Sequence, residues 1–105
     1  MKLAIVVVDH FQDHEFEVPY TTLIEKGFKV DIVSDTIGIK TGKLGSTIKA
    51  TKTFEQTHLK DYKGIIFVGG PGAKVLIENI QAHILCIEAV EQNKLLAAIC
   101  VAPCI

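Results

Sequence analysis

Continuous apolar runs alternate along this chain with segments whose apolar residues recur at helical spacing. The runs at residues 2–8, 64–68 and 95–99 are rich in β-branched or aliphatic side chains, and each predicts a strand buried on both faces of a sheet. Residues 28–34 alternate apolar and polar side chains and follow a glycine, which predicts a further strand. Between the strands, helical spacing predicts one helix from near Glu15 to Gly27 and another over residues 74–93.

Two details of these helices can be tested. Pro19 comes too late to be the first residue of a helix that begins near Glu15, so we expect either a later start or an irregular first turn. In the second helix, Ile80, Ile84 and Ile87 share one face, and we expect that face to lie on the sheet.

Residues 35–53 break the strand and helix alternation. Short β-rich pieces around three glycines predict a hairpin or a small β excursion, and residues 57–62 predict a helical turn before the next strand. The hairpin is locally basic, and we interpret its lysines as a solvated edge that discourages further strand pairing: Lys40, Lys43, Lys49 and Lys52.

Alternating strands and helices predict an α/β fold with an open parallel sheet and helices on both faces. Ligands bind such sheets outside the carboxyl ends of the strands. The residues that follow the predicted strands are therefore the candidates for a site: Asp9, Ser34, Asp35, Gly69, Gly70 and Cys100.

Cys100 is the strongest candidate for chemistry. It directly follows a buried strand and precedes small residues and Pro103, a setting similar to a strand-to-turn nucleophile elbow. A helix beginning there would favour the thiolate through its amide groups and dipole. The alternative is a buried, inert cysteine, because cysteine is among the residue types most often buried.

Glu15 is the second candidate, because the loop after the first strand reaches the same edge and a carboxyl group there could exchange protons with a substrate. Glu17 and Asp13 compete for this role, and a solvated acid at a helix start is the structural alternative. The amides of Gly69 and Gly70 could hold an oxyanion, although a plain turn explains the two glycines equally well.

The remaining motifs do not predict a metal, nucleotide or dithiol site. The acidic and histidine residues at 9–15 have a metal-like composition, but they fall in a predicted loop, where four-residue spacing does not bring ligands together, so we expect no metal. No dinucleotide or phosphate-loop motif is present in the sequence, and we expect no cofactor. Cys86 lies among apolar helical residues and is interpreted as core, and the spacing of Cys100 and Cys104 is not that of a dithiol motif.

Composition narrows the function classes. With 105 residues, a net charge of -1 and 49% apolar residues, the chain is expected to form a single domain that binds neither nucleic acid nor membrane. Three irregularly spaced cysteines favour a reducing cytoplasm over a secreted disulfide framework. The sequence ends soon after a predicted buried strand, so we expect the domain to be the amino-terminal portion of a longer one, or a dimer to supply the missing cover.

Three separated motifs resemble the ThiJ/PfpI superfamily: DHFQDHEFEVP at 9–19, FVGGPG at 67–72 and AAICVAP at 97–103. The resemblance implies a flavodoxin-like fold, here truncated after the nucleophile-elbow strand. It also implies a reactive Cys100 with Glu15 as its carboxyl neighbour and an oxyanion site formed by the amides of Gly70 and Val101. The function implied is that of a cytoplasmic, homodimeric enzyme acting on small reactive carbonyls or glycated adducts.

Two departures from the family pattern bear on the subfamily. Val68 stands where the family often has proline, and Val101 stands where peptidase-like members usually have histidine. The similarity is thus closer to the deglycase branch than to an intracellular cysteine peptidase. A redox-sensing or chaperone-like protein, in which Cys100 oxidises to the sulfinate beside a protonated Glu15, is the non-enzymatic alternative. Family domains also continue past the elbow, often with a further histidine, so we expect activity from a longer form.

Overall fold

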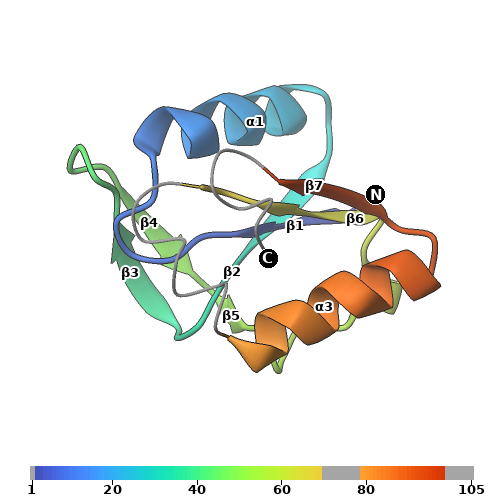
Figure 1. Cartoon of the computed structure of the whole chain (residues 1–105). Coiled ribbons are helices and arrows are strands. Elements are labelled where there is room, and N and C mark those ends of the chain that lie inside the picture. Colours follow the sequence, from blue (N-terminus) through green and yellow to red (C-terminus); the bar gives the residue numbers. More distant parts are fainter. Residues whose placement is uncertain (1, 70–78, 99–105) are drawn as a thin grey trace.

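A five-stranded sheet lies at the centre of the computed structural model, which describes residues 2–69 and 79–98 (Figure 1). The strand order is β5-β2-β1-β6-β7, and every pairing in this sheet is parallel. The strands are β1 (Lys2–Val6), β2 (Lys29–Ser34), β5 (Lys52–Thr53), β6 (Gly64–Phe67) and β7 (Leu95–Ala98). The predicted α/β class with a parallel sheet is confirmed.

The central strand β1 explains the continuous apolar run near the amino terminus. All residues from Leu3 to Val8 are buried, and their side chains alternate between two cores. Ala4 and Val6 pack on the side of the sheet that carries helix α3 (Ile80–Glu91), and Ile5 and Val7 pack on the side of helix α1 (Asp13–Glu25). Because both faces are covered, the positions from Leu3 onward are all apolar.

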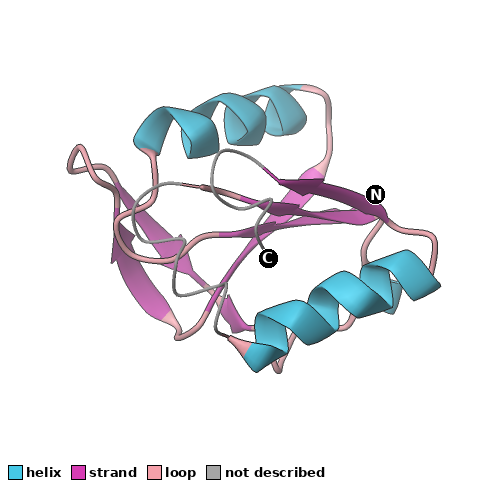
Figure 2. Ribbon diagram, in the orientation of Figure 1, coloured by secondary structure: helices cyan, strands magenta, loops and turns pink. Residues whose placement is uncertain are grey.

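Helices α1 and α3 lie on opposite faces of the sheet (Figure 2). Helix α1 ends as predicted before Gly27, whose φ of 88° is the left-handed conformation that glycine favours at a helix end. Of the two expected alternatives, the later start is wrong, because the helix already begins at Asp13 and continues through Pro19. Phe16 and Leu23, packed in the core on either side of Pro19, hold the helix across the position that lacks an amide.

The prediction for the packing face of α3 is also wrong. Ile80, Ile84 and Ile87 are 73%, 39% and 56% exposed. The buried face is the opposite one, formed by Ala82, Leu85 and Ala89, with half-buried Cys86 beside it. Two alanines on this face let the helix lie close to the sheet, whereas three isoleucines would hold it away. The described part of the predicted helix starts at Ile80, and residues 74–78 lie outside the described residues.

Strand β7 is less buried than expected. Leu95 and Leu96 are 57% and 40% exposed, because β7 is the last strand on its side of the described sheet and has a partner only in β6. Ile99, the last residue of the predicted strand, lies outside the described residues. Neither helix in the described part of the chain is long and apolar enough to cross a membrane.

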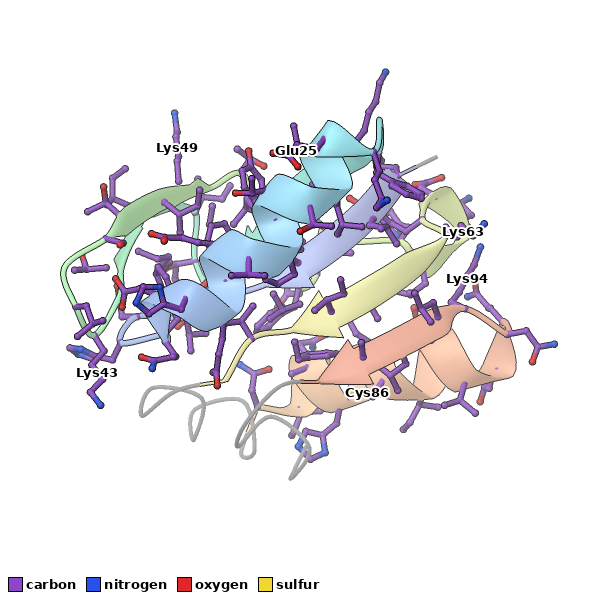
Figure 3. All side chains as sticks on the ribbon, turned by 90° about the horizontal axis from the view of Figure 1, so that it is seen from above. Glu25, Lys43, Lys49, Lys63, Cys86 and Lys94 are labelled. Carbon is purple, nitrogen blue, oxygen red and sulfur yellow. The ribbon has the colours of Figure 1, made fainter. Side chains whose placement is uncertain are left out.

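The predicted hairpin is present and stands beside the main sheet as an antiparallel pair of strands, β3 (Gly38–Thr41) and β4 (Thr47–Ala50). The predicted helical turn is a short 3-10 helix, η1 (Leu59–Asp61). Lys43 and Lys49 point away from the hairpin into solvent, as expected (Figure 3). The prediction of a solvated Lys40 is wrong: it is 5% exposed, and its Nζ atom lies 3.3 Å from the Asp35 carboxylate and also contacts Thr36.

Candidate active site

The strand order has a switch point between β1 and β6. From β1 the chain proceeds to β2 and β5 on one side, and it then returns to place β6 and β7 on the other. Such a switch point opens a crevice at the carboxyl ends of the two neighbouring strands and is the usual ligand site of open α/β sheets. The loop that follows β1 and residues 68–69, which follow β6, therefore define the described part of the candidate site.

A hydrogen bond joins these two connections. The amide of Gln12 donates to the carbonyl oxygen of Gly69 over 3.0 Å. This bond joins the residue before α1 to the second residue after β6. On the other side of β6, the register pairs Phe67 with Ala98, the last residue of β7. The carboxyl ends of β1, β6 and β7 thus lie side by side at one edge of the sheet.

Glu15 lies in the first turn of α1, at the third helical position. A glutamate at this position commonly reaches back to the amide of the residue that caps the helix. Here the capping residue is Gln12, whose amide is already bound to Gly69. The Oε2 atom of Glu15 is buried and has no hydrogen-bond partner among residues 2–69 and 79–98, and the same holds for Oε1 of Gln12. A buried carboxyl oxygen without a partner is costly, so a hydrogen bond to this atom would be favourable.

The carboxylates of Asp13 and Glu17, the two other candidate acids, are hydrogen-bonded to the hairpin. Asp13 is 2% exposed, and its carboxylate accepts hydrogen bonds from the amides of Leu44 and Ser46, each over 2.8 Å. Burial by itself would raise the pKa of Asp13, but these hydrogen bonds outweigh it and hold the pKa below its ordinary value. Glu17 is exposed and accepts a hydrogen bond from the Ser46 hydroxyl over 3.0 Å. Of the three acids, Glu15 is the one with a buried, unpaired oxygen.

The remaining predicted site residues, Cys100, Gly70 and Val101, lie outside the described residues. The structure therefore describes Glu15 and the strand ends on which the predicted site depends, and the roles of the other three residues stay predictions. Among the described residues, no group of three or more histidine, cysteine, aspartate and glutamate side chains gathers as it would around a metal ion.

Cys86 does not belong to this edge. It is half-buried beneath β7, packed against the core on the α3 side, and burial raises the pKa of its thiol (Figure 3). The interpretation of Cys86 as a structural residue agrees with this position, because a thiol with a raised pKa is a poor nucleophile near neutral pH.

A polar cluster that the sequence did not reveal lies elsewhere on the α3 side of the sheet. Tyr62 donates a hydrogen bond over 2.6 Å to Oδ2 of Asp31, and Lys2 and Lys52 reach the same oxygen at 3.3 and 3.5 Å. Burial opposes ionisation of Asp31, yet these donors lower the pKa of its carboxyl group, while burial and the carboxylate raise the pKa of Tyr62. The four residues come from four different strands or connections, so no local sequence pattern predicts the cluster.

A polar hollow of about 190 Å³ lies near the carboxyl ends of β2 and β5, on the same sheet edge. Its described lining consists of Asp35, Thr53, Phe54, Glu55, Asn79 and Gln81. The side chain of Asn79 accepts a hydrogen bond from the Ala82 amide at the start of α3, so this residue serves as a helix cap. The hollow borders the next pair of strands along the sheet and does not include Glu15.

Comparison with known proteins places the chain in a family. The DJ-1/PfpI family profile matches residues 1–105. An uncharacterized protein of Methanocaldococcus jannaschii is 36% identical over 96% of this chain and 50% of its own length, and a deglycase of Pyrococcus abyssi is 30% identical over 98% and 62%. The crystal structure of a ThiJ/PfpI domain protein from Brachyspira murdochii superposes with a TM-score of 0.87 at 25% identity, covering 92% of this chain and 56% of that one. The chain thus spans 50% to 62% of the length of these two curated relatives.

Proposed function

The chain belongs to the DJ-1/PfpI family, and from this premise we propose that it acts through Cys100 on small reactive carbonyls or their protein adducts. The observation that carries the proposal is that Oε2 of Glu15, at the switch point of the sheet, is buried and has no hydrogen-bond partner within the described part of the chain. The deglycase name of relatives about 30% identical to the chain supports the substrate class.

The proposed reaction begins with a proton transfer from the Cys100 thiol to the Glu15 carboxylate. The thiolate then attacks the carbonyl carbon, so that a carbon–sulfur bond forms and the carbonyl π electrons move onto oxygen. Amides of Gly70 and Val101 stabilise this oxyanion, and Glu15 returns the proton to it, giving a neutral hemithioacetal. With methylglyoxal, the proton on the hemithioacetal carbon then moves to the neighbouring ketone carbon, which gives a thioester. Water attacks the thioester, the carbon–sulfur bond breaks, and lactate leaves while the Cys100 thiol is restored. Proton transfer by a positioned carboxyl group contributes about 10²–10⁴-fold to such reactions.

Three features support this assignment of roles. The Gln12–Gly69 hydrogen bond holds the start of α1 against Gly69, the residue that precedes Gly70 in the sequence. Strand β7 runs parallel to β6 and ends two residues before Cys100. Asp13 and Glu17, the other acids near the start of α1, are bound to the hairpin, whereas Oε2 of Glu15 has no hydrogen-bond partner among residues 2–69 and 79–98.

Turnover of methylglyoxal by the purified protein, produced from its own gene, tests the proposal, because we expect activity from a longer form. We expect Cys100→Ala to reduce consumption to the uncatalysed rate, and Glu15→Gln to lower kcat by about 100-fold or more. Glu17→Gln and Cys86→Ala are matched controls that remove a carboxylate from the same helix and a thiol from the core, and both should retain the wild-type rate. Undiminished turnover by Cys100→Ala would eliminate the mechanism.

The redox-sensing alternative predicts a different chemical result from the same variants. Two equivalents of peroxide would oxidise Cys100 to the sulfinic acid with release of water, and Glu15 would donate a hydrogen bond to the product. Selective oxidation of Cys100 by mild peroxide, seen by mass spectrometry without carbonyl turnover, would favour sensing over catalysis. Equal modification of Cys86, Cys100 and Cys104 would count against both functions.

Association into a homodimer and a cytoplasmic location stay predictions. Analytical ultracentrifugation of the purified protein tests the first, and fractionation of cells that express it from its own promoter tests the second. A monomer at all concentrations would refute the dimer, and recovery outside the cytoplasm would refute the location.

A further inference from the structure

The loop between β1 and α1 is fastened to the β3–β4 hairpin by a set of hydrogen bonds that we call the hairpin clamp. Two are main-chain bonds, from the His10 amide to the Thr41 carbonyl over 2.7 Å and from the Lys43 amide to the Phe11 carbonyl over 2.8 Å. The other members join side-chain carboxylates of the loop and helix start to hairpin amides: Thr41 to Asp9, and Leu44 and Ser46 to Asp13. These hydrogen bonds therefore fix the loop before Glu15 to the hairpin.

Asp13 is the buried member of this clamp. Each of its carboxylate oxygens accepts one amide hydrogen bond, from Leu44 and from Ser46. Gly42 closes the remaining side, because a Cβ atom at that position would lie 2.5 Å from Oδ2 of Asp13. The carboxylate is thus bound by the amides of Leu44 and Ser46, and Gly42 lies close beside it. By contrast, Asp9, which binds the same hairpin, is exposed.

The first turn of α1 is fixed from two sides. Asp13 holds it to the hairpin, and the neighbouring Gln12 amide holds it to Gly69 at the end of β6. Residues two apart on a helix do not face each other, so Glu15 projects away from the side that Asp13 binds. An orientation fixed at Asp13 consequently fixes the direction in which Glu15 leaves the helix.

We propose that Asp13, through the hairpin clamp, is the positioning residue for Glu15. The inference rests on the proposed function, because it assigns Asp13 a role only if Glu15 serves the Cys100 reaction. Its physical basis is that a displacement of about 1 Å in a reacting group can cost about 100-fold in rate. Asp13 does not touch the reacting atoms and acts only through the placement of the first turn.

Asp13→Asn tests the proposal with almost no change in the size of the side chain. The new amide nitrogen is a donor, so it opposes one of the two hairpin amides and cannot accept its hydrogen bond. We expect kcat with methylglyoxal to fall by about 10- to 100-fold while KM stays unchanged, because the lost geometry concerns proton transfer rather than binding. If Asp13→Asn does not fold, Gly42→Ala is the second variant. Its methyl group would clash with the Asp13 carboxylate and should also lower kcat.

A double-mutant cycle with Glu15→Gln separates positioning from a general structural effect. If Asp13 acts through Glu15, then Asp13→Asn should have no further effect once Glu15 is already glutamine. Reductions that multiply in the double variant, or a wild-type kcat in Asp13→Asn, would overturn the inference. Glu17→Gln is the matched control, since it removes an exposed carboxylate that also binds Ser46, and it should retain the wild-type kcat.

The same data separate this inference from the proposed function. Full activity of Cys100→Ala or of Glu15→Gln would refute the roles assigned to those residues and, with them, any positioning by Asp13. Loss of activity in both of those variants, together with an unaffected Asp13→Asn, would leave the proposed function standing and refute the role of Asp13 alone.

Discussion

Shortening Leu85 to alanine should destabilise the protein far more than shortening Ile87. Leu85 is 2% exposed and packs into the core between α3 and the sheet, so its removal combines a lost transfer free energy with a cavity and should cost about 2–5 kcal/mol. Ile87 is 56% exposed, and its truncation should cost about 1 kcal/mol or less. For a chain of this size, the Leu85 variant should therefore melt on the order of 10 °C or more below the wild type.

Urea titration followed by circular dichroism measures both costs, with the slope of the transition checked for two-state unfolding. The pair of variants tests the face on which α3 packs, since hydrophobic spacing alone favoured the isoleucines. An Ile87→Ala cost equal to or larger than that of Leu85→Ala would refute the packing described here. A measurement at two protein concentrations would reveal any contribution from self-association to the Ile87 result.

Three further predictions concern the sheet. Tyr62→Phe removes the 2.6 Å hydrogen bond to Asp31 and should lower the free energy of unfolding by about 1–2 kcal/mol in urea, and an unchanged midpoint would contradict it. The folded-state pKa of Asp31 is lowered, so its carboxylate stabilises the fold above about pH 4 and loses this effect as pH falls through the folded pKa. Asp31→Asn should consequently show a weaker loss of stability in acid than the wild type. Gly64→Ala places a Cβ 2.7 Å from the Leu95 carbonyl oxygen and should cost about 1–3 kcal/mol by thermal melting, where wild-type stability would argue against this contact.

Local patterns were sufficient to predict the elements that depend on local chemistry. The apolar runs located β1 and β6 because these strands are covered on both faces, and Gly27 marked the end of α1 because the chain needs a left-handed residue there. The edge of the sheet that carries the candidate site followed from the parallel topology. Glu15 could be named from its place after β1, but its advantage over Asp13 became visible only with the hairpin contacts.

Where the sequence failed, the deciding contacts are distant along the chain or depend on shape. Helix α3 has apolar residues on both faces, so periodicity could not choose between the Ile87 face and the Leu85 face, and close packing decided. Lys40 is buried against Asp35, five residues before it, a separation that neither helix nor strand periodicity brings together. The partners of Asp13 lie 31 and 33 residues further along the chain, beyond any local pattern.

The position of β1 in the middle of the sheet also has a consequence for biosynthesis. Its pairing with β6 joins Leu3 to Gly64, so the two halves of this contact leave the ribosome about 60 residues apart. At about 5–20 residues per second, translation leaves β1 without that neighbour for roughly 3 to 12 s. The strand at the centre of the sheet is therefore synthesised well before one of its two neighbours, and we expect early folding to depend on β2 or on a chaperone to shield β1 until β6 is made.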